Sequence, residues 1–219
     1  MLPDAESTAP AAGRLPADDR PSAGAGRGMP GGRGRVLATA LVLLGLLSGA
    51  VLRFVSPTAL WLDEAQSVAI ARSGHLFTAL REDGAPPLYY LLLRGWTSVF
   101  GTSAVAVRAM SGLFGLAALA LAWELGRRLA GRRVALALTL LLTSSPFAIR
   151  YSSETRMYSL VVLLVLLGAA AVVWTLRRPG PWPVVAVALS GAALLLTHYW
   201  TGYLLAVVCL LYTSDAADE

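Results

Sequence analysis

Long apolar segments dominate the sequence and constrain its fold more than any other feature. They run at about 36–55, 106–126, 134–149, 157–176 and 183–200, and another begins near residue 201. A membrane-crossing helix needs about 20 apolar residues. Only 14% of the residues are charged, well below the roughly 25% of soluble domains. The pattern predicts an all-α integral membrane protein built as a multi-span helical bundle, and it excludes an ordinary soluble enzyme.

Both ends of the chain differ from this central part. Residues 1–35 are rich in Pro, Gly and Ala and carry mixed charges, which predicts a disordered cytoplasmic tail. Residues 36–208 form the predicted transmembrane domain. The last stretch, 209–219, reads CLLYTSDAADE and resembles a translated transposase-type sequencing adapter. We expect 209–219 to be an artefactual tail and the chain to be the N-terminal part of a longer protein.

Arginine clusters beside the apolar segments predict the orientation of the chain. The net charge is +5, but arginines flanking apolar segments are typical of topology signals and not of a nucleic-acid surface. Clusters at 33–35, 127–133 and 177–178 all lie on one side if segment 86–100 does not cross the membrane. The positive-inside rule then places the N-terminus in the cytoplasm of a multi-pass protein of the plasma membrane. If 86–100 does cross, the later clusters move outside, which violates the rule.

Acidic residues between positions 36 and 208 gather on the predicted outer side. Five of the six lie in outer loops: Asp63, Glu64, Glu82, Asp83 and Glu154. The sixth, Glu124, lies within helical reach of Arg127 and Arg128, so we expect an ion pair there. Carboxylates are costly in hydrocarbon, and acids beside apolar segments are therefore excluded from it or functional.

The adjacent pair Asp63 and Glu64 follows the first apolar segment. Asp63 is expected to cap a short helix from Glu64 to about Ser73. A carboxylate at this position can accept a proton from a hydroxyl group as a general base, or bind a divalent metal through oxygen. The alternative is an ordinary helix cap with an acid in its first turn.

A second candidate site lies in the sequence RYSSETRMYSL. The spacing of Arg150, Glu154 and Tyr158 places all three on one face of a helix. Arg150 and Arg156 supply guanidinium groups suited to bidentate contact with phosphate. The alternative is a pair of snorkelling arginines partnered by one Glu.

Aromatic residues mark two further places on the outer side. Tyr89, Tyr90 and Trp96 follow the rigid Pro86-Pro87 turn. His198 and Tyr199 lie at the outer end of the fifth apolar segment. Aromatic residues at an interface are usually membrane anchors, but they also suit stacking on a sugar or lining a lipid groove. A lone His is more often structural than a base or ligand.

The order of these motifs resembles the GT-C superfamily of membrane glycosyltransferases. WLDEAQSVA, PPLYYLLL, RYSSETRMYSL and LTHYW follow one another at matching topology. The chain looks most like bacterial members of glycosyltransferase family 39, related to protein O-mannosyltransferases. The resemblance implies a polyprenyl-phosphate-linked sugar donor, consumed on the outer face with inversion at the anomeric carbon. It leaves the sugar, the acceptor and the dependence on a divalent metal open.

The resemblance also implies roles for individual residues. Asp63 matches the first-loop acid taken as the general base, with Glu64 beside it as a catalytic candidate. Glu154 matches the second-loop acid, and Arg156 and Arg150 are expected near the donor phosphate. Pro87 and Tyr89 match the loop segment near the donor, and His198 and Tyr199 are candidates for lining the substrate site. Ala85 stands where some relatives carry a basic residue or His before the first proline.

Two other functions remain compatible with the sequence. One is a non-catalytic membrane protein such as a lipid-linked sugar flippase or transporter, although such a protein more often carries charges near the midplane of its spans. The other is an assembly subunit whose outer acids bind cations. As an expected fragment, the isolated chain is predicted to be inactive in sugar transfer.

Overall fold

The computed structural model describes residues 32–55 and 58–217, and within them every regular element is a helix. The helices are α1 (Gly32–Leu52), α2 (Leu62–Arg72), α3 (Leu76–Asp83), α4 (Pro87–Phe100), α5 (Ala104–Ser144), α6 (Pro146–Ser152), α7 (Tyr158–Arg177), α8 (Pro181–Leu195) and α9 (Thr201–Ala217). The all-α prediction is confirmed. The predicted tail lies outside the described residues up to residue 31, and the final residues 218–219 lie outside them too.

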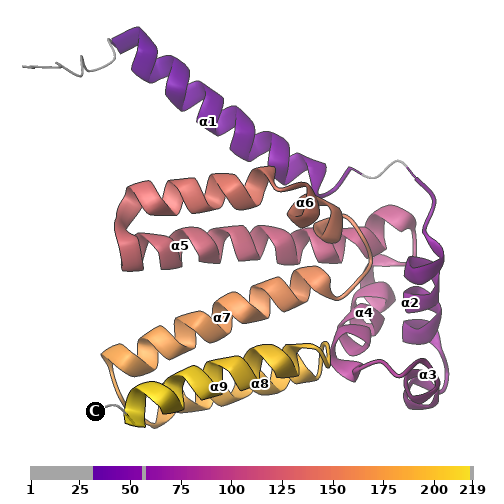
Figure 1. The fold of residues 1–219 in the computed structure, drawn as a ribbon. Helices are drawn as coiled ribbons and strands as arrows, with labels where there is room; N and C mark the ends of the chain where they lie inside the picture. Colours follow the sequence, from indigo (N-terminus) through magenta and orange to yellow (C-terminus); the bar gives the residue numbers. More distant parts are fainter. Residues whose placement is uncertain (1–31, 56–57, 218–219) are drawn as a thin grey trace, which may run out of the picture.

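In the part of the chain that the structure describes, two helices, α5 and α7, are long and apolar enough to cross a membrane by length and composition. Shorter apolar stretches lie in α1 (Thr39–Leu52), α8 and α9 (Thr201–Leu210). The helices α5, α7, α8 and α9 run roughly along one another in Figure 1, and α1 lies obliquely to them. Many of their large apolar side chains are exposed, as expected where a helix faces lipid tails. The fold is that of a helical membrane protein.

Helix α5 folds back on itself at Gly131. The backbone there has φ 84° and ψ 173°, a conformation essentially restricted to glycine. The two arms of α5 then lie side by side (Figure 1), and a Cβ added at Gly126 would lie 3.1 Å from the Cα of Ala135. The segments predicted at 106–126 and 134–149 therefore form a hairpin. The second prediction is wrong at its end, because α5 ends at Ser144 and Pro146 starts α6.

Helices α2, α3 and α4 gather at one end of the long helices (Figure 1). Two hydrogen bonds fix α4 there: Trp96 Nε1 donates to the Ala106 carbonyl at 2.7 Å, and the Leu88 amide donates to the Leu196 carbonyl at 2.9 Å. With 14 residues, α4 is shorter than the about 20 residues of a spanning helix. This arrangement supports the interpretation of 86–100 as an interfacial segment.

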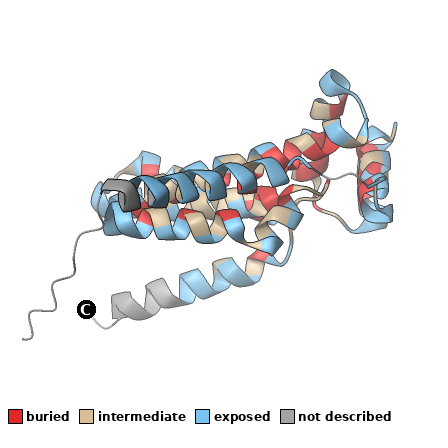
Figure 2. Ribbon diagram, turned by 90° about the horizontal axis from the view of Figure 1, so that it is seen from above, coloured by how far each residue is buried: buried red, intermediate tan, exposed pale blue. Residues whose placement is uncertain are grey.

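The main core lies where these short helices meet the bundle. Its largest buried members come from α4 (Tyr89, Tyr90, Leu93) and are joined by residues of α2, α3, α5 and α7. Buried residues, red in Figure 2, are concentrated in this part of the chain. Full burial of a side chain such as Leu93 contributes about 1.5–3 kcal/mol. This core holds the start of α2 at a fixed position relative to α5 and α7.

Helix α1 crosses the second arm of α5 at Gly49. A Cβ at this position would clash with the backbone and side chain of Thr143, so glycine is required by the close approach. Buried Arg53, just beyond α1, donates hydrogen bonds to the carbonyls of Gly49 at 2.5 Å and Leu142 at 2.8 Å. Its guanidinium therefore satisfies carbonyls at the ends of two helices.

Candidate functional site

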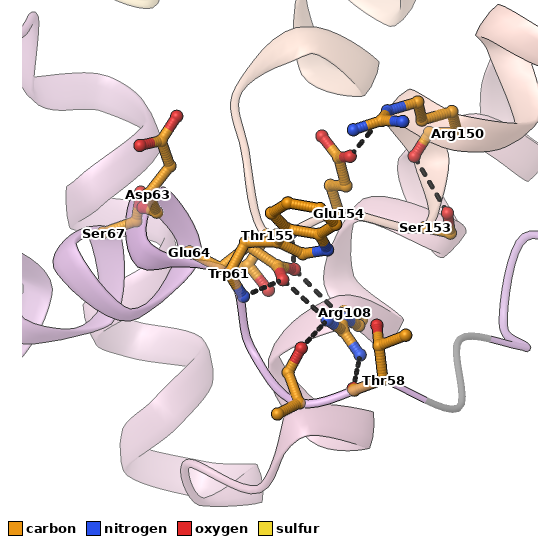
Figure 3. Close-up of polar contacts among 11 residues, drawn as sticks. Thr58, Trp61, Asp63, Glu64, Ser67, Arg108, Arg150, Ser153, Glu154 and Thr155 are labelled. Atoms are coloured by element: carbon orange, nitrogen blue, oxygen red, sulfur yellow. Dashed lines mark hydrogen bonds and ion pairs between the residues drawn. The ribbon is translucent and has the colours of Figure 1, made fainter.

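The start of α2 separates the two adjacent acids. The helix begins at Leu62 with Trp61 as N-cap and ends at Arg72. Glu64 folds back so that its Oε2 accepts the Trp61 amide at 3.0 Å, as in a capping box. The predicted cap at Asp63 is therefore wrong: the longer Glu64 side chain reaches the cap amide, and Asp63 lies in the first turn. Figure 3 shows Glu64 directed toward Arg108 and Asp63 directed away from it.

Glu64 is buried in an ion pair with Arg108 of α5. Arg108 Nε lies 2.9 Å from Oε1 and Nη2 lies 2.6 Å from Oε2, and both side chains are at most 4% exposed. The amide of Thr155 donates to Oε1 at 2.8 Å (Figure 3). Burial alone would raise the pKa of Glu64, but the hydrogen bonds from Arg108, Thr155 and Trp61 outweigh it and lower the pKa. Glu64 thus joins α2, α5 and the loop after α6.

Arg108 was not among the residues predicted for the site. It also donates to the carbonyls of Thr58 at 2.7 Å and Ala59 at 3.1 Å, so it holds the chain leading into α2. A signal was present, because a lone arginine within an apolar segment is costly in hydrocarbon and usually has a partner. The identity of that partner follows only from the fold, since Arg108 and Glu64 are 44 positions apart.

Asp63 presents its carboxylate to solvent beside Arg156. Its side chain is 68% exposed, and its Oδ2 lies 3.6 Å from Arg156 Nη1. The Arg156 guanidinium also lies over the ring of Tyr158, with its Cζ 5.8 Å from the ring centroid. The pKa of Arg156 is raised: burial opposes the rise, and interactions with Tyr158 and Asp63 outweigh it. An acceptor for protons and a fixed cation therefore lie side by side.

Arg150 and Glu154 form an ion pair, with 2.9 Å between Nε and Oε1, as the alternative interpretation of this motif expects. The predicted shared helix with Tyr158 is wrong, because α6 ends at Ser152 and α7 begins at Tyr158. The intervening loop lets the Thr155 amide turn toward Glu64, which a continuous helix would prevent. Arg150 also lies over the Trp61 ring, 6.0 Å from its centroid.

These groups line one open cavity of about 530 Å³. Five predicted residues line it: Asp63, Glu64, Arg150, Glu154 and Arg156. Tyr158 lines it as well, and the sequence did not single out the remaining lining residues, Trp61, Leu62, Phe147 and Tyr151. The lining combines three carboxylates and two guanidiniums with aromatic side chains. Such a site suits a ligand that has both an anionic group and a sugar-like face.

Four predicted residues lie outside this cavity lining. Tyr89 is fully buried in the core, where burial raises the pKa of its hydroxyl, and Pro87 begins α4. The His198 ring lies 6.1 Å from that of Tyr158, which lines the cavity, and His198 itself does not line it. Burial and the charge of Arg156 lower the pKa of His198. Tyr199 is 63% exposed.

Candidate metal ligands are not clustered in the part of the chain that the structure describes. No group of three or more His, Cys, Asp or Glu residues lies close enough there to hold an ion. Asp63 and Glu154 are the carboxylates directed to the open cavity, since Glu64 is engaged by Arg108.

The family model for dolichyl-phosphate-mannose-protein mannosyltransferases matches residues 84–217. The chain belongs to this family. No curated protein and no solved structure matches the chain. The matched range includes Arg150, Glu154 and Arg156, whereas Asp63 and Glu64 precede it. At the level of the family, the match supports a membrane glycosyltransferase that takes its sugar from a polyprenyl-phosphate donor.

Proposed function

We propose that the protein transfers a sugar from a polyprenyl-phosphate donor to an acceptor hydroxyl, with inversion, and that Asp63 is the general base. The observation that carries this proposal is the pairing of exposed Asp63 with Arg156 at the open cavity, at 3.6 Å. The donor class follows from the family match.

The reaction needs a base for the acceptor hydroxyl on one side of the anomeric carbon and cations for the departing phosphate on the other side. The acceptor oxygen forms a bond to that carbon, the bond from carbon to phosphate oxygen breaks, and the hydroxyl proton passes to Asp63. The leaving group is polyprenyl phosphate, which departs as an anion without needing a proton. Attack opposite to the leaving group inverts the anomeric configuration. A positioned base contributes about 10²–10⁴-fold to such a step.

Arg156 and Arg150 are the proposed partners of the donor phosphate. Guanidinium groups bind phosphate oxygens in a bidentate manner and stabilise the charge that develops on the leaving group. In the free protein each arginine has a carboxylate neighbour, Asp63 and Glu154 respectively. A bound phosphate competes for Arg156, and this competition frees Asp63 to accept the hydroxyl proton.

The other predicted residues have supporting roles in this proposal. Glu64 uses both oxygens in hydrogen bonds to Arg108, Thr155 and Trp61, so it positions α2 and does not transfer protons. Pro87 and Tyr89 orient α4 from its first turn and from the core. His198 helps to position Tyr158 through the contact between their rings, and Tyr199 contacts substrate or lipid from its exposed position.

The proposed orientation follows the arginine clusters. Those clusters lie at the opposite end of the bundle from α2–α4 (Figure 1). The positive-inside rule then assigns the cavity to the outer face of the plasma membrane and the N-terminus to the cytoplasm. A lipid-linked donor reaches this cavity from the bilayer surface, where its phosphate lies.

The test is Asp63→Asn in the full-length protein, assayed in membranes with a labelled polyprenyl-phosphate mannose. We expect transfer and release of polyprenyl phosphate to fall at least about 10²-fold. Glu82→Gln is the matched control, because Glu82 is an exposed acid of the same outer region that does not line the cavity. Unchanged turnover in the Asp63 variant would exclude this base. Movement of the labelled lipid across the bilayer without transfer would favour a flippase.

A further inference from the structure

A second cleft lies at the end of the bundle opposite Asp63. It has a volume of about 560 Å³ and runs between the first arm of α5 and the end of α7. Arg128 comes from α5, and Arg177 and Arg178 come from the end of α7. Arg177 Nη2 lies 3.4 Å from the Arg128 carbonyl, so the two helices meet at the cleft. No residue of this cleft lines the cavity of Asp63.

The cleft has more positive charge than the neighbouring acid neutralises. Glu124 lies at its edge and is shared by Arg127 and Arg128, at 2.7 and 2.5 Å. Among the residues that the structure describes, no carboxylate lies within ion-pair distance of Arg177 or Arg178. Guanidinium groups without a carboxylate partner retain their capacity for a phosphate.

The remaining walls of the cleft are apolar. Leu121 and Leu125 of α5 face Ala170, Val173 and Trp174 of α7. Trp174 is 46% exposed, and tryptophan is enriched at the level of lipid headgroups. Both helices are long and apolar enough to cross a membrane, so their ends lie near a headgroup layer. The cleft is thus cationic at the surface and apolar toward the bilayer.

We propose that this cleft binds the phosphate headgroup of an anionic phospholipid. Arg128, Arg177 and Arg178 contact the phosphate, and the acyl chains lie along the apolar side past Trp174. Basic pockets between membrane helices bind anionic headgroups in this manner. A free phosphate ion shares the headgroup chemistry but would make no use of the apolar wall. The proposal concerns a lipid at the opposite end from the reaction cavity and does not depend on the proposed function.

The test measures binding of short-chain phosphatidylglycerol and phosphatidylcholine to the full-length protein purified in detergent. We expect the wild type to prefer phosphatidylglycerol, and Arg177→Gln/Arg178→Gln to lose about tenfold or more of that affinity. The matched control is Arg132→Gln/Arg133→Gln, which removes the same charge at the same end from residues that do not line the cleft. We expect the control to retain most of the preference.

Three outcomes would overturn the proposal. Equal losses in the two double variants would show general surface attraction and not a site. Unchanged affinity in Arg177→Gln/Arg178→Gln would exclude these arginines. Displacement of the lipid by inorganic phosphate alone, with no discrimination between lipids, would assign the cleft to a free ion. Arg177→Lys/Arg178→Lys is a control for misfolding of the Gln variant. It keeps both positive charges and is expected to retain part of the preference for phosphatidylglycerol.

Discussion

Two carboxylate–arginine clusters lie at opposite ends of the bundle and differ in their burial. Glu64 and Arg108 are 1% and 4% exposed, and they connect elements far apart in sequence. Glu124 with Arg127 and Arg128 is 36–64% exposed and stays within one helix. A buried pair must keep both partners, because removal of one leaves an unpaired charge. An exposed pair is replaced by water at little cost. The same chemical group is therefore essential at one end and dispensable at the other.

Removal of one buried partner should give the largest effect. Glu64→Gln removes the carboxylate that is hydrogen-bonded to the buried Arg108 guanidinium and is expected to destabilise the fold by about 3–5 kcal/mol. The apparent midpoint of thermal unfolding in detergent measures the loss, with Glu82→Gln as control. A midpoint equal to that of the wild type would show that water reaches Arg108.

The second prediction concerns the turn at Gly131, which lies beside the exposed cluster of Glu124, Arg127 and Arg128. Gly131→Ala places a side chain at φ 84°, which is expected to cost about 1–3 kcal/mol. The control is Gly45→Ala in α1, where an added Cβ meets open space. Equal unfolding midpoints for the two variants would contradict the strain assigned to Gly131.

Acid should lower the stability contributed by the Glu64–Arg108 pair, but by less than the two substitutions above. Protonation of Glu64 removes its charge but leaves its oxygens in place. The folded-state pKa is lowered, below the unfolded value of about 4.3. The stabilisation is therefore complete above that unfolded value and is lost as the pH falls toward the folded pKa. We expect the unfolding midpoint of the wild type to fall below about pH 4 more steeply than that of Glu64→Gln. Parallel profiles would contradict this prediction.

Substitution of Glu124 in the exposed cluster should have the smallest effect on the unfolding midpoint. In Glu124→Gln the arginines remain hydrated, so we expect an unfolding midpoint that cannot be distinguished from the wild type at physiological salt. The measurement is repeated at low salt, where screening is weaker and a small decrease should emerge. A decrease at physiological salt as large as that of Glu64→Gln would remove the contrast between the two ends.

Local patterns in the sequence were sufficient for the helical class and for the short-range pairs. The apolar segments predicted helices. Spacing predicted the pair Glu124–Arg127 and placed Arg150 and Glu154 within reach of each other, and the structure contains both ion pairs. Both pairs lie within four residues, where helical or turn geometry suffices. The donor class also followed from motif order and agrees with the family match.

Contacts between residues far apart in the sequence could not be predicted in the same way. Asp63 and Glu64 are adjacent acids, and no local rule decides which one turns toward Arg108. Capping propensity favours Asp, yet the longer side chain of Glu64 reaches the cap amide and Arg108 together. Tyr89 was matched to the donor-site segment by the family resemblance, and the sequence did not predict that its side chain is fully buried in the core.

The division of labour between Asp63 and Glu64 also limits how α2 tolerates insertions and deletions. Successive residues of an α-helix point about 100° apart, so a gain or loss of one residue between Trp61 and Glu64 would rotate each carboxylate into its neighbour's direction. A gain would turn the shorter Asp63 side chain toward Arg108, and a loss would turn Ala65 there; in both cases Glu64 would no longer face Arg108. Substitutions at exposed positions of α2 should thus be tolerated more readily than any change in the length of the chain before Glu64.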